Sequence, residues 1–173
     1  CGRIADTLFA AGSAGVLDSS YGLIGYAFQI YFDFSGYSDM AIGLGLMIGF
    51  VFPKNFDSPY VSRSVTEFWR RWHLSLSTWL RDYLYVPLGG SRKGRGRTYV
   101  NLLFVMLLGG LWHGASWNFV IWGAFHGALL AIERALGVDR LYGWMPRPMR
   151  VATTFSLVLV SWVFFRAADL PAA

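Results

Sequence analysis

The sequence contains a single cysteine and few charged residues. Because Cys1 is the only cysteine among 173 residues, an internal disulfide and a cysteine-rich metal cluster are both excluded. Charged residues make up 14% of the chain, whereas about a quarter is usual for soluble domains. Hydrophobic residues account for 55% of the chain and aromatic residues for 18%. This composition predicts an integral membrane protein rather than a soluble domain.

Acidic residues are scarcer than basic ones, which leaves a net charge of +5. The basic residues gather in three clusters, Arg70–Arg71, Arg92–Arg97 and Arg147–Arg150. In a membrane protein such clusters indicate which loops face the cytoplasm. We therefore expect the basic loop at residues 89–97 to be cytoplasmic and to contact anionic membrane lipid. No motif for reading bases accompanies the clusters, and no nucleic-acid partner is predicted.

A long run at residues 99–132 includes no Asp, Glu, Lys or Arg. As one straight helix it would be about 50 Å long, whereas the hydrocarbon core of a membrane is about 30 Å thick. The run must therefore tilt strongly, break, or be buried in a larger assembly. Gly109, Gly110 and Gly114 favour a break near His113, and a broken helix needs protein or a watery cavity around its free backbone groups. We expect His113 in a cavity wall, about 20 Å into the membrane.

A second apolar run, at residues 21–52, carries two acidic side chains, Asp33 and Asp39. At about 1.5 Å per residue, a helix of this length is longer than one membrane span needs and shorter than two. A carboxylate inside a membrane is costly, so both residues are functional candidates. Alternatively, they hydrogen-bond the backbone at a helix break near Gly36.

Two further patterns concern helices in a membrane. Gly45 and Gly49 have the GxxxG spacing, which allows two helices to approach closely in lipid, although chance spacing in a glycine-rich chain is equally compatible. The apolar residues 151–165 lie between Arg150 and Arg166 and are short for a full span. Flanking arginines can extend such a span by reaching toward the interface.

Residues 64–85 have the pattern of one amphipathic helix lying in the membrane interface. Ser64 and Glu67 have the spacing of a capping box at a helix N-terminus. His73 lies on the shoulder of the apolar face, where by itself it indicates an interfacial histidine. The apolar and aromatic residues recur near the helical period, and they are Phe68, Trp69, Trp72, Leu76, Trp79, Leu80 and Tyr83.

His113 has two possible roles within the uncharged run. It can be a structural hydrogen-bonding residue, or it can be a general base, because burial favours neutral imidazole and neutral imidazole accepts the proton of a hydroxyl. His126 would point to nearly the opposite face of a continuous helix, which favours a structural role. A metal site built from His73, His113 and either Asp33 or Asp39 would lack any recognisable ligand spacing, and no metal is predicted.

Three motifs occur in an order that resembles the membrane-bound O-acyltransferase (MBOAT) family, and most of all its bacterial alginate O-acetyltransferase branch. They read YFDFSGYSDMAIGLGLMIGF, FWRRWHLSLSTWLRDYLYVPLGG and NLLFVMLLGGLWHGASWNFVIWGAFHG. The resemblance extends over residues 21–166. It implies a polytopic all-α membrane fold in which tilted and broken helices surround a buried cavity.

The resemblance also implies an active site. The catalytic histidine of the family would be His113, in the motif Trp112-His113-Gly114, and His73 would be its partner. The donor would be acetyl-CoA or another acyl thioester that binds as a substrate, with no resident cofactor. Arg92 and Arg95 are candidates for binding the phosphates of an acyl-CoA. The complete set of candidate substrate-binding residues is Asp33, Asp39, Trp112, Asn118, Arg92 and Arg95.

As a whole, residues 1–173 are expected to form a single, partial domain of this fold in the cell (inner) membrane, with spans missing before and after it. The predicted reaction is acetyl transfer to a hydroxyl of an exopolysaccharide such as alginate. The hydroxyl acceptor is expected on the outer side of the membrane. It belongs either to the polymer itself or to a periplasmic or extracellular protein that relays the acetyl group. Three alternatives remain open from the sequence: transfer of D-alanyl or another acyl group, a transporter or channel, and a non-catalytic assembly subunit.

Overall fold

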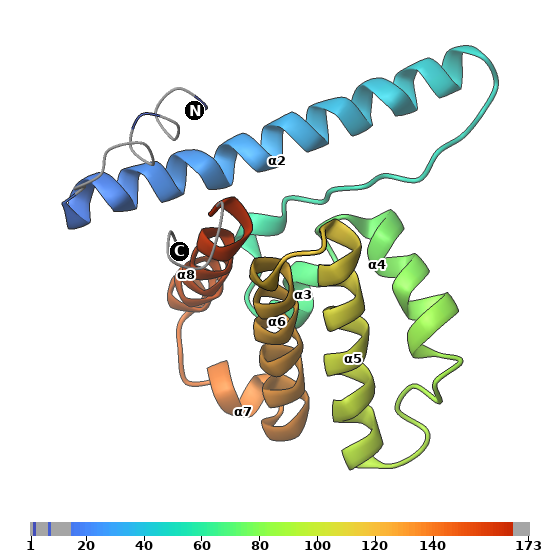
Figure 1. The fold of residues 1–173 in the computed structure, drawn as a ribbon, viewed down its shortest axis with the longest axis vertical. Coiled ribbons are helices and arrows are strands. Elements are labelled where there is room, and N and C mark those ends of the chain that lie inside the picture. The colour runs from blue at the N-terminus through green and yellow to red at the C-terminus, as the bar shows by residue number, and fades with distance from the viewer. Residues whose placement is uncertain (1, 3–6, 8–14, 168–173) are drawn as a thin grey trace. The chain divides into compact units, whose positions relative to one another are not determined.

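The computed structural model describes residues 15–167 together with residues 2 and 7 (Figure 1). Within these residues the chain forms helices joined by turns and contains no β-strand, which confirms the all-α class. The chain divides into two compact units, Cys1–Asn55 and Phe56–Ala173.

The first unit contains one long helix, α2 (Val16–Met47). It begins five residues before the apolar run expected from residue 21, and its 32 residues correspond to about 48 Å. The helix continues through Gly36, so the alternative of a helix break there is excluded. A single glycine costs a helix interior only about 1 kcal/mol relative to alanine, which the apolar residues on either side can offset.

Glycines also build the end of α2. The carbonyl of Gly45 accepts hydrogen bonds from the N–H groups of Ile48 and Phe50, at 3.1 and 2.8 Å. Gly49 has a φ of 87°, which glycine adopts without the steric cost that a Cβ would bring. The ring of Phe52 folds back over Gly45. The GxxxG interpretation is therefore wrong, because one glycine is covered by its own chain and the other lies beyond the helix.

The second unit is organised around a hairpin of two antiparallel helices, α5 (Arg95–His113) and α6 (Trp117–Leu136) (Figure 1). The predicted break near His113 is confirmed, because α5 ends at this residue and α6 starts four residues later. Ser116 caps α6, since its hydroxyl accepts a hydrogen bond from the N–H of Asn118 at 3.3 Å. The uncharged run is thus two helices rather than one long tilted span.

Three glycines allow the two helices of the hairpin to lie in contact. A Cβ added to Gly110 would overlap the backbone carbonyl of Phe119, and one added to Gly123 would overlap the carbonyl of Met106. A Cβ on Gly127 would lie 2.9 Å from the Cα of Leu103. Backbone therefore packs directly on backbone, as small residues permit between helices in membranes.

The chain continues through α7 (Val138–Tyr142) into α8 (Arg147–Arg166), which packs on α6. The helix α8 has 20 residues, so the expectation that this segment is short for a span is corrected; the basic residues before the apolar run belong to the helix. Both α6 and α8 are long and apolar enough to cross a membrane.

The segment predicted as one amphipathic helix is divided into three pieces, α3 (Val65–Trp69), α4 (Leu74–Leu80) and the π-helical turn η2 (Arg81–Tyr85). A short 3-10 helix, η1 (Pro59–Val61), precedes them. The single-helix prediction is wrong because the aromatic face splits. Its first half enters the core, where Trp72 is 4% exposed, whereas Trp79 is 55% exposed.

We expect Gly110→Ala to destabilise the intact protein by about 1–3 kcal/mol, because the added methyl group must push α5 away from the carbonyl of Phe119. The matched control is Gly96→Ala on the same helix, where a Cβ meets no atom within 4 Å. This control should be neutral or slightly stabilising, since alanine is the better helix former. Thermal unfolding of the purified protein in detergent measures both, and a Gly110→Ala midpoint at or above the wild-type value would contradict the packing argument.

Candidate active site

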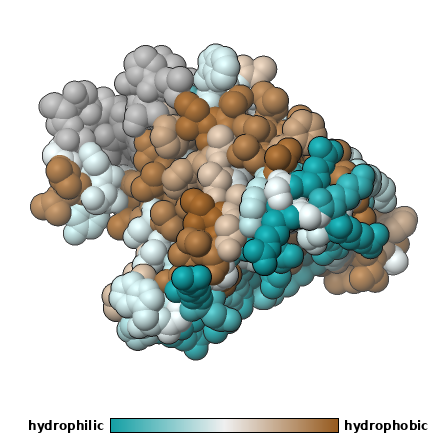
Figure 2. Space-filling model, turned by 90° about the horizontal axis from the view of Figure 1, so that it is seen from below, coloured by the Kyte–Doolittle hydropathy of each residue, from teal (hydrophilic) through white to brown (hydrophobic). Residues whose placement is uncertain are grey.

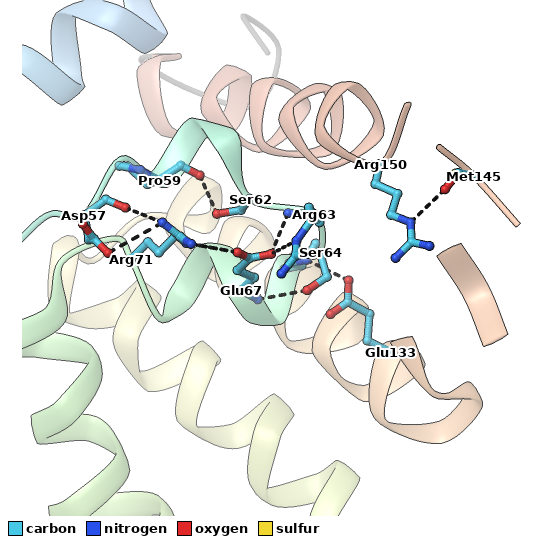
Figure 3. Close-up of polar contacts among 11 residues, drawn as sticks. Asp57, Pro59, Ser62, Arg63, Ser64, Glu67, Arg71, Glu133, Met145 and Arg150 are labelled. Carbon is cyan, nitrogen blue, oxygen red and sulfur yellow. Dashed lines mark hydrogen bonds and ion pairs between the residues drawn. The ribbon is translucent and has the colours of Figure 1, made fainter. Parts of the chain in front are cut away.

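The start of α3 is fixed by hydrogen bonds to its free N–H groups. Ser64 is the N-cap, and its hydroxyl accepts a hydrogen bond from the N–H of Glu67 at 3.0 Å. This confirms one half of the predicted capping box, whereas the Glu67 carboxylate accepts from the N–H of Arg63 rather than from that of Ser64. The Glu67 carboxylate in turn accepts hydrogen bonds from the backbone and side chain of Arg63 and from the guanidinium of Arg71 (Figure 3). Partial burial raises the pKa of Glu67, but these hydrogen bonds and the Arg63 charge outweigh burial and lower it.

Glu133, which the sequence analysis did not single out, holds the same helix end from α6. One carboxylate oxygen accepts hydrogen bonds from the N–H of Val65, at 2.7 Å, and from the hydroxyl of Tyr142, at 2.9 Å. The other accepts from the N–H of Thr66 at 2.8 Å. A carboxylate that is 2% exposed is stable there because donors and the positive end of a helix surround it. Burial, and secondarily this charge, raises the pKa of Tyr142.

His73 joins α3 to α4 in a strained backbone conformation. Its φ of 47° and ψ of 55° are left-handed values, which cost a residue with a side chain about 1–2 kcal/mol. The hydroxyl of Ser75 lies 3.4 Å from its Nδ1. Burial, and secondarily the charge of His113, lowers the pKa of His73 to about 4. Strain of this kind is found at functional sites more often than elsewhere.

The two candidate histidines, forty residues apart in sequence, meet across one indole ring. Trp112 lies with its ring centroid 6.5 Å from that of His73 and 5.0 Å from that of His113. His113 is half-buried at the end of α5, whereas Trp112 is 65% exposed. The structure therefore brings together three of the predicted site residues: His73, Trp112 and His113.

Aromatic rings form the inner wall of this site. The ring of His113 packs edge-on against Trp122 and Phe165, at centroid distances of 5.3 and 5.0 Å. Behind them His126 is 0% exposed and accepts a hydrogen bond at Nδ1 from the indole N–H of Trp69, at 3.3 Å. An Nδ1 acceptor requires the proton of the neutral ring on Nε2. The buried position agrees with the structural role predicted for His126.

Three other predicted site residues lie on α6 and on α2. Asn118 is buried and donates a hydrogen bond from Nδ2 to the carbonyl of Ala167, at 2.8 Å, so it connects the start of α6 to the end of α8. Asp33 and Asp39 are exposed on α2, in the other unit. In the part of the chain that is described, no three His, Cys, Asp or Glu side chains form a metal-binding group.

The predicted phosphate-binding arginines lie far along α5 from His113. Arg95 is in the first turn of α5 and lines a cavity of about 370 Å³ together with Arg134. Arg92 is exposed in the preceding turn and is not among the lining residues of that cavity. Arg95 and His113 are the two ends of α5, 18 positions apart, which corresponds to about 27 Å.

Comparison with known proteins decides the family. A family model described as MBOAT, membrane-bound O-acyltransferase family, matches residues 18–165. The chain belongs to the membrane-bound O-acyltransferase family. Within this MBOAT chain, the matched region extends over parts of both units and includes every candidate site residue.

Several curated MBOAT relatives are similar to this chain. A protein named "Probable alginate O-acetylase AlgI" from Azotobacter vinelandii is 61% identical over 170 residues, which cover 98% of this chain and 34% of that protein. A peptidoglycan O-acetyltransferase from Helicobacter pylori is 48% identical over 87% of this chain and 29% of its own length. A teichoic acid D-alanyltransferase from Streptococcus thermophilus is 35% identical over 81% of this chain and 39% of its own length. The chain thus spans about a third of the length of its MBOAT relatives.

We expect Glu133→Gln to destabilise the intact MBOAT protein by about 1–3 kcal/mol, because an amide group would face N–H donors that now have a buried acceptor. Tyr142→Phe removes only one hydrogen bond to the same oxygen and should cost about 1 kcal/mol. Denaturant or thermal unfolding in detergent measures both variants. Equal stability of Glu133→Gln and wild type would show that Glu133 does not anchor α3.

Proposed function

We propose that the protein containing this chain is an O-acyltransferase that moves an acyl group from a thioester donor to a hydroxyl acceptor. The observation that carries the proposal is the meeting of His113 and His73 on the ring of Trp112. Both histidines lie in the motifs on which the family resemblance rests. The half-buried position of His113 leaves part of the ring accessible to a reactant while aromatic rings hold it from behind.

In the proposed reaction, His113 is the general base. Its unprotonated nitrogen accepts the proton of the acceptor hydroxyl as that oxygen attacks the carbonyl carbon of the thioester. A carbon–oxygen bond forms, the carbon–sulfur bond breaks, and the proton passes from His113 to the departing thiolate. His73, neutral at pH 7 because its pKa is lowered to about 4, is available as a hydrogen-bond donor to the developing oxyanion. The proton and the charges are balanced in this scheme, and no covalent acyl-enzyme is needed.

The acyl group that we propose is acetyl, supplied by acetyl-CoA, and the acceptor is a hydroxyl of an alginate-like exopolysaccharide. The support is the 61% identity to a protein named as a probable alginate O-acetylase. Transfer of D-alanyl to a cell-envelope polymer is a second candidate, supported by the 35% identity to a teichoic acid D-alanyltransferase. The acceptor hydroxyl belongs either to the polymer or to an outer-side protein that relays the acetyl group.

For the orientation, we propose a polytopic protein of the inner membrane whose basic end faces the cytoplasm. Arg95 and Arg134 line one cavity, and Arg134 and Arg150 line another, so three sequence-distant basic regions gather at one end of the second unit. Such an excess of arginine favours the cytoplasmic side. The donor would then enter from the basic end, and a cavity formed with the rest of the protein would lead to His113.

We expect His113→Ala to lower ester formation by about 100-fold or more, because the general base is lost. The measurement is the ester content of secreted polymer from cells that carry the intact wild-type or variant protein, alongside transfer from labelled acetyl-CoA in isolated membranes. Equal amounts of both proteins in the membrane, with equal thermal midpoints, exclude a folding defect. Normal polymer acetylation in the variant would point to a non-catalytic subunit, and solute movement without ester formation would point to a transporter.

We expect His73→Gly and His73→Ala to lower ester formation equally, since both remove the ring. Their stabilities should differ, because only glycine adopts the left-handed backbone at this position without strain. The Gly variant should therefore be more stable than the Ala variant by about 1 kcal/mol. Thermal unfolding of the two purified variants tests this difference. An Ala variant as stable as the Gly variant would contradict a strained His73.

A further inference from the structure

Two arginines at the basic end, Arg70 and Arg134, have no carboxylate partner among residues 15–167. Their neighbours differ: Arg63 pairs with Glu67, and Arg71 pairs with Glu67 and Asp57. Arg70 ends α3, and Arg134 lies in the last turn of α6. A guanidinium that has no protein partner is free to bind an anion with two parallel hydrogen bonds.

Both arginines line the same two cavities. The first is polar and has a volume of about 670 Å³. Two of its three carboxylates are already engaged, Glu67 by arginines and Glu133 by backbone N–H groups and Tyr142. Four arginines face three carboxylates there, namely Arg63, Arg70, Arg134 and Arg150 with Glu67, Glu133 and Asp139. This cavity therefore favours an anionic group.

The second cavity is an apolar groove of about 340 Å³ between the α3–α4 segment and the α5–α6 hairpin. Trp69 also lines this groove. Its indole N–H is already hydrogen-bonded to His126, so the ring offers the groove an apolar surface. Arg70 and Arg134 stand at the junction of this groove with the polar cavity, because both line each of them. The aliphatic part of the lining consists of Leu80, Leu102, Val105, Met106 and Leu130. The two cavities together match a molecule with an anionic head and an apolar tail.

The groove lies along a membrane-length helix, which indicates the kind of molecule. Arg134 is at the end of α6, and Leu130 is one turn farther into it. On α5 the lining runs inward from Leu102 to Met106. In a membrane, the end of a span is at the level of lipid phosphates and the next turns are at the level of the acyl chains. Figure 2, which views the molecule from below the orientation of Figure 1, shows clusters of hydrophilic residues beside apolar ones.

The groove is separate from the candidate active site. Its lining includes neither His73 nor His113, and on α5 it stops at Met106. Met106 and His113 are seven positions apart on this helix, which corresponds to about 10 Å. The groove of this chain therefore ends about 10 Å short of the imidazole.

We propose that this groove binds one anionic phospholipid. Its phosphate lies between Arg70 and Arg134, and one acyl chain lies along Leu102, Val105 and Leu130. The bound lipid connects α3 to the α5–α6 hairpin and so stabilises the backbone that leads to His73. The proposal rests on the cavities and on membership of a membrane-bound family, and it does not depend on acyl transfer.

The test uses the intact protein purified in a mild detergent, with native mass spectrometry to detect bound lipid and thermal unfolding to measure stabilisation. Phosphatidylglycerol should remain bound and raise the thermal midpoint, whereas phosphatidylcholine should do neither. The double variant Arg70→Gln/Arg134→Gln should bind phosphatidylglycerol about tenfold or more weakly, since two phosphate contacts are lost. The matched control is Arg140→Gln, which removes a cation from the same end without touching the groove.

A second variant, Leu102→Trp, fills the groove without changing any charge, and it should also lose phosphatidylglycerol. If the double variant does not fold, Leu102→Trp still tests whether the groove binds the lipid. Equal stabilisation by phosphatidylcholine, or undiminished lipid binding in Leu102→Trp, would overturn the proposal. CoA or inorganic phosphate that displaces the lipid, or stabilises the protein as strongly, would assign the arginines to a soluble phosphate ligand instead. Ester formation is measured in parallel on the same variants. Lipid binding and ester formation are thus separate readouts, so a failure of the lipid proposal can be told apart from a failure of the proposed catalytic function.

Discussion

The candidate site depends on the direct backbone contact between α5 and α6. Gly110 and Gly123 each face a carbonyl of the opposite helix, at a distance that leaves no room for a side chain. This contact turns an uncharged run that is too long for one span into a hairpin, and it places His113 at the turn. Without this contact, His113 would lie in the middle of one continuous helix. Its ring would then have no accessible face at a turn, and His73 would not be brought close to it.

Two polar connections then hold α3 against the hairpin, and both have a partner on α6. The Glu133 carboxylate accepts hydrogen bonds from the first N–H groups of α3, and His126 accepts one from Trp69 near its end. Both acceptor side chains, Glu133 and His126, are buried, where a lost hydrogen bond would be costly. The aromatic rings around these hydrogen bonds add buried contact area but no directional interaction. These connections fix the backbone of α3, which ends four residues before the left-handed His73, and so help the chain to maintain this strained conformation.

Charge and aromatic side chains separate along the hairpin. Arginines gather where α5 begins and α6 ends, and aromatic rings surround the turn where His113 lies. Such a separation suits a membrane protein, because cations are stable beside lipid phosphates and aromatic rings are stable deeper in the bilayer or at its far interface. It also places the arginines at one end of the hairpin and His113 at the other.

The sequence by itself determined the membrane character, the all-α class, the break near His113 and the cap at Ser64, because each depends on local composition or on a few neighbouring residues. The three motifs indicated the family and the histidine pair. The tertiary structure alone decided that the segment after Ser64 is divided at His73, that α2 continues through Gly36, and that Glu133 anchors α3. It also decided that Arg70 and Arg134 share two cavities. These features arise from contacts between residues far apart in the chain, where burial and hydrogen bonding outweigh the local preferences that a sequence pattern records.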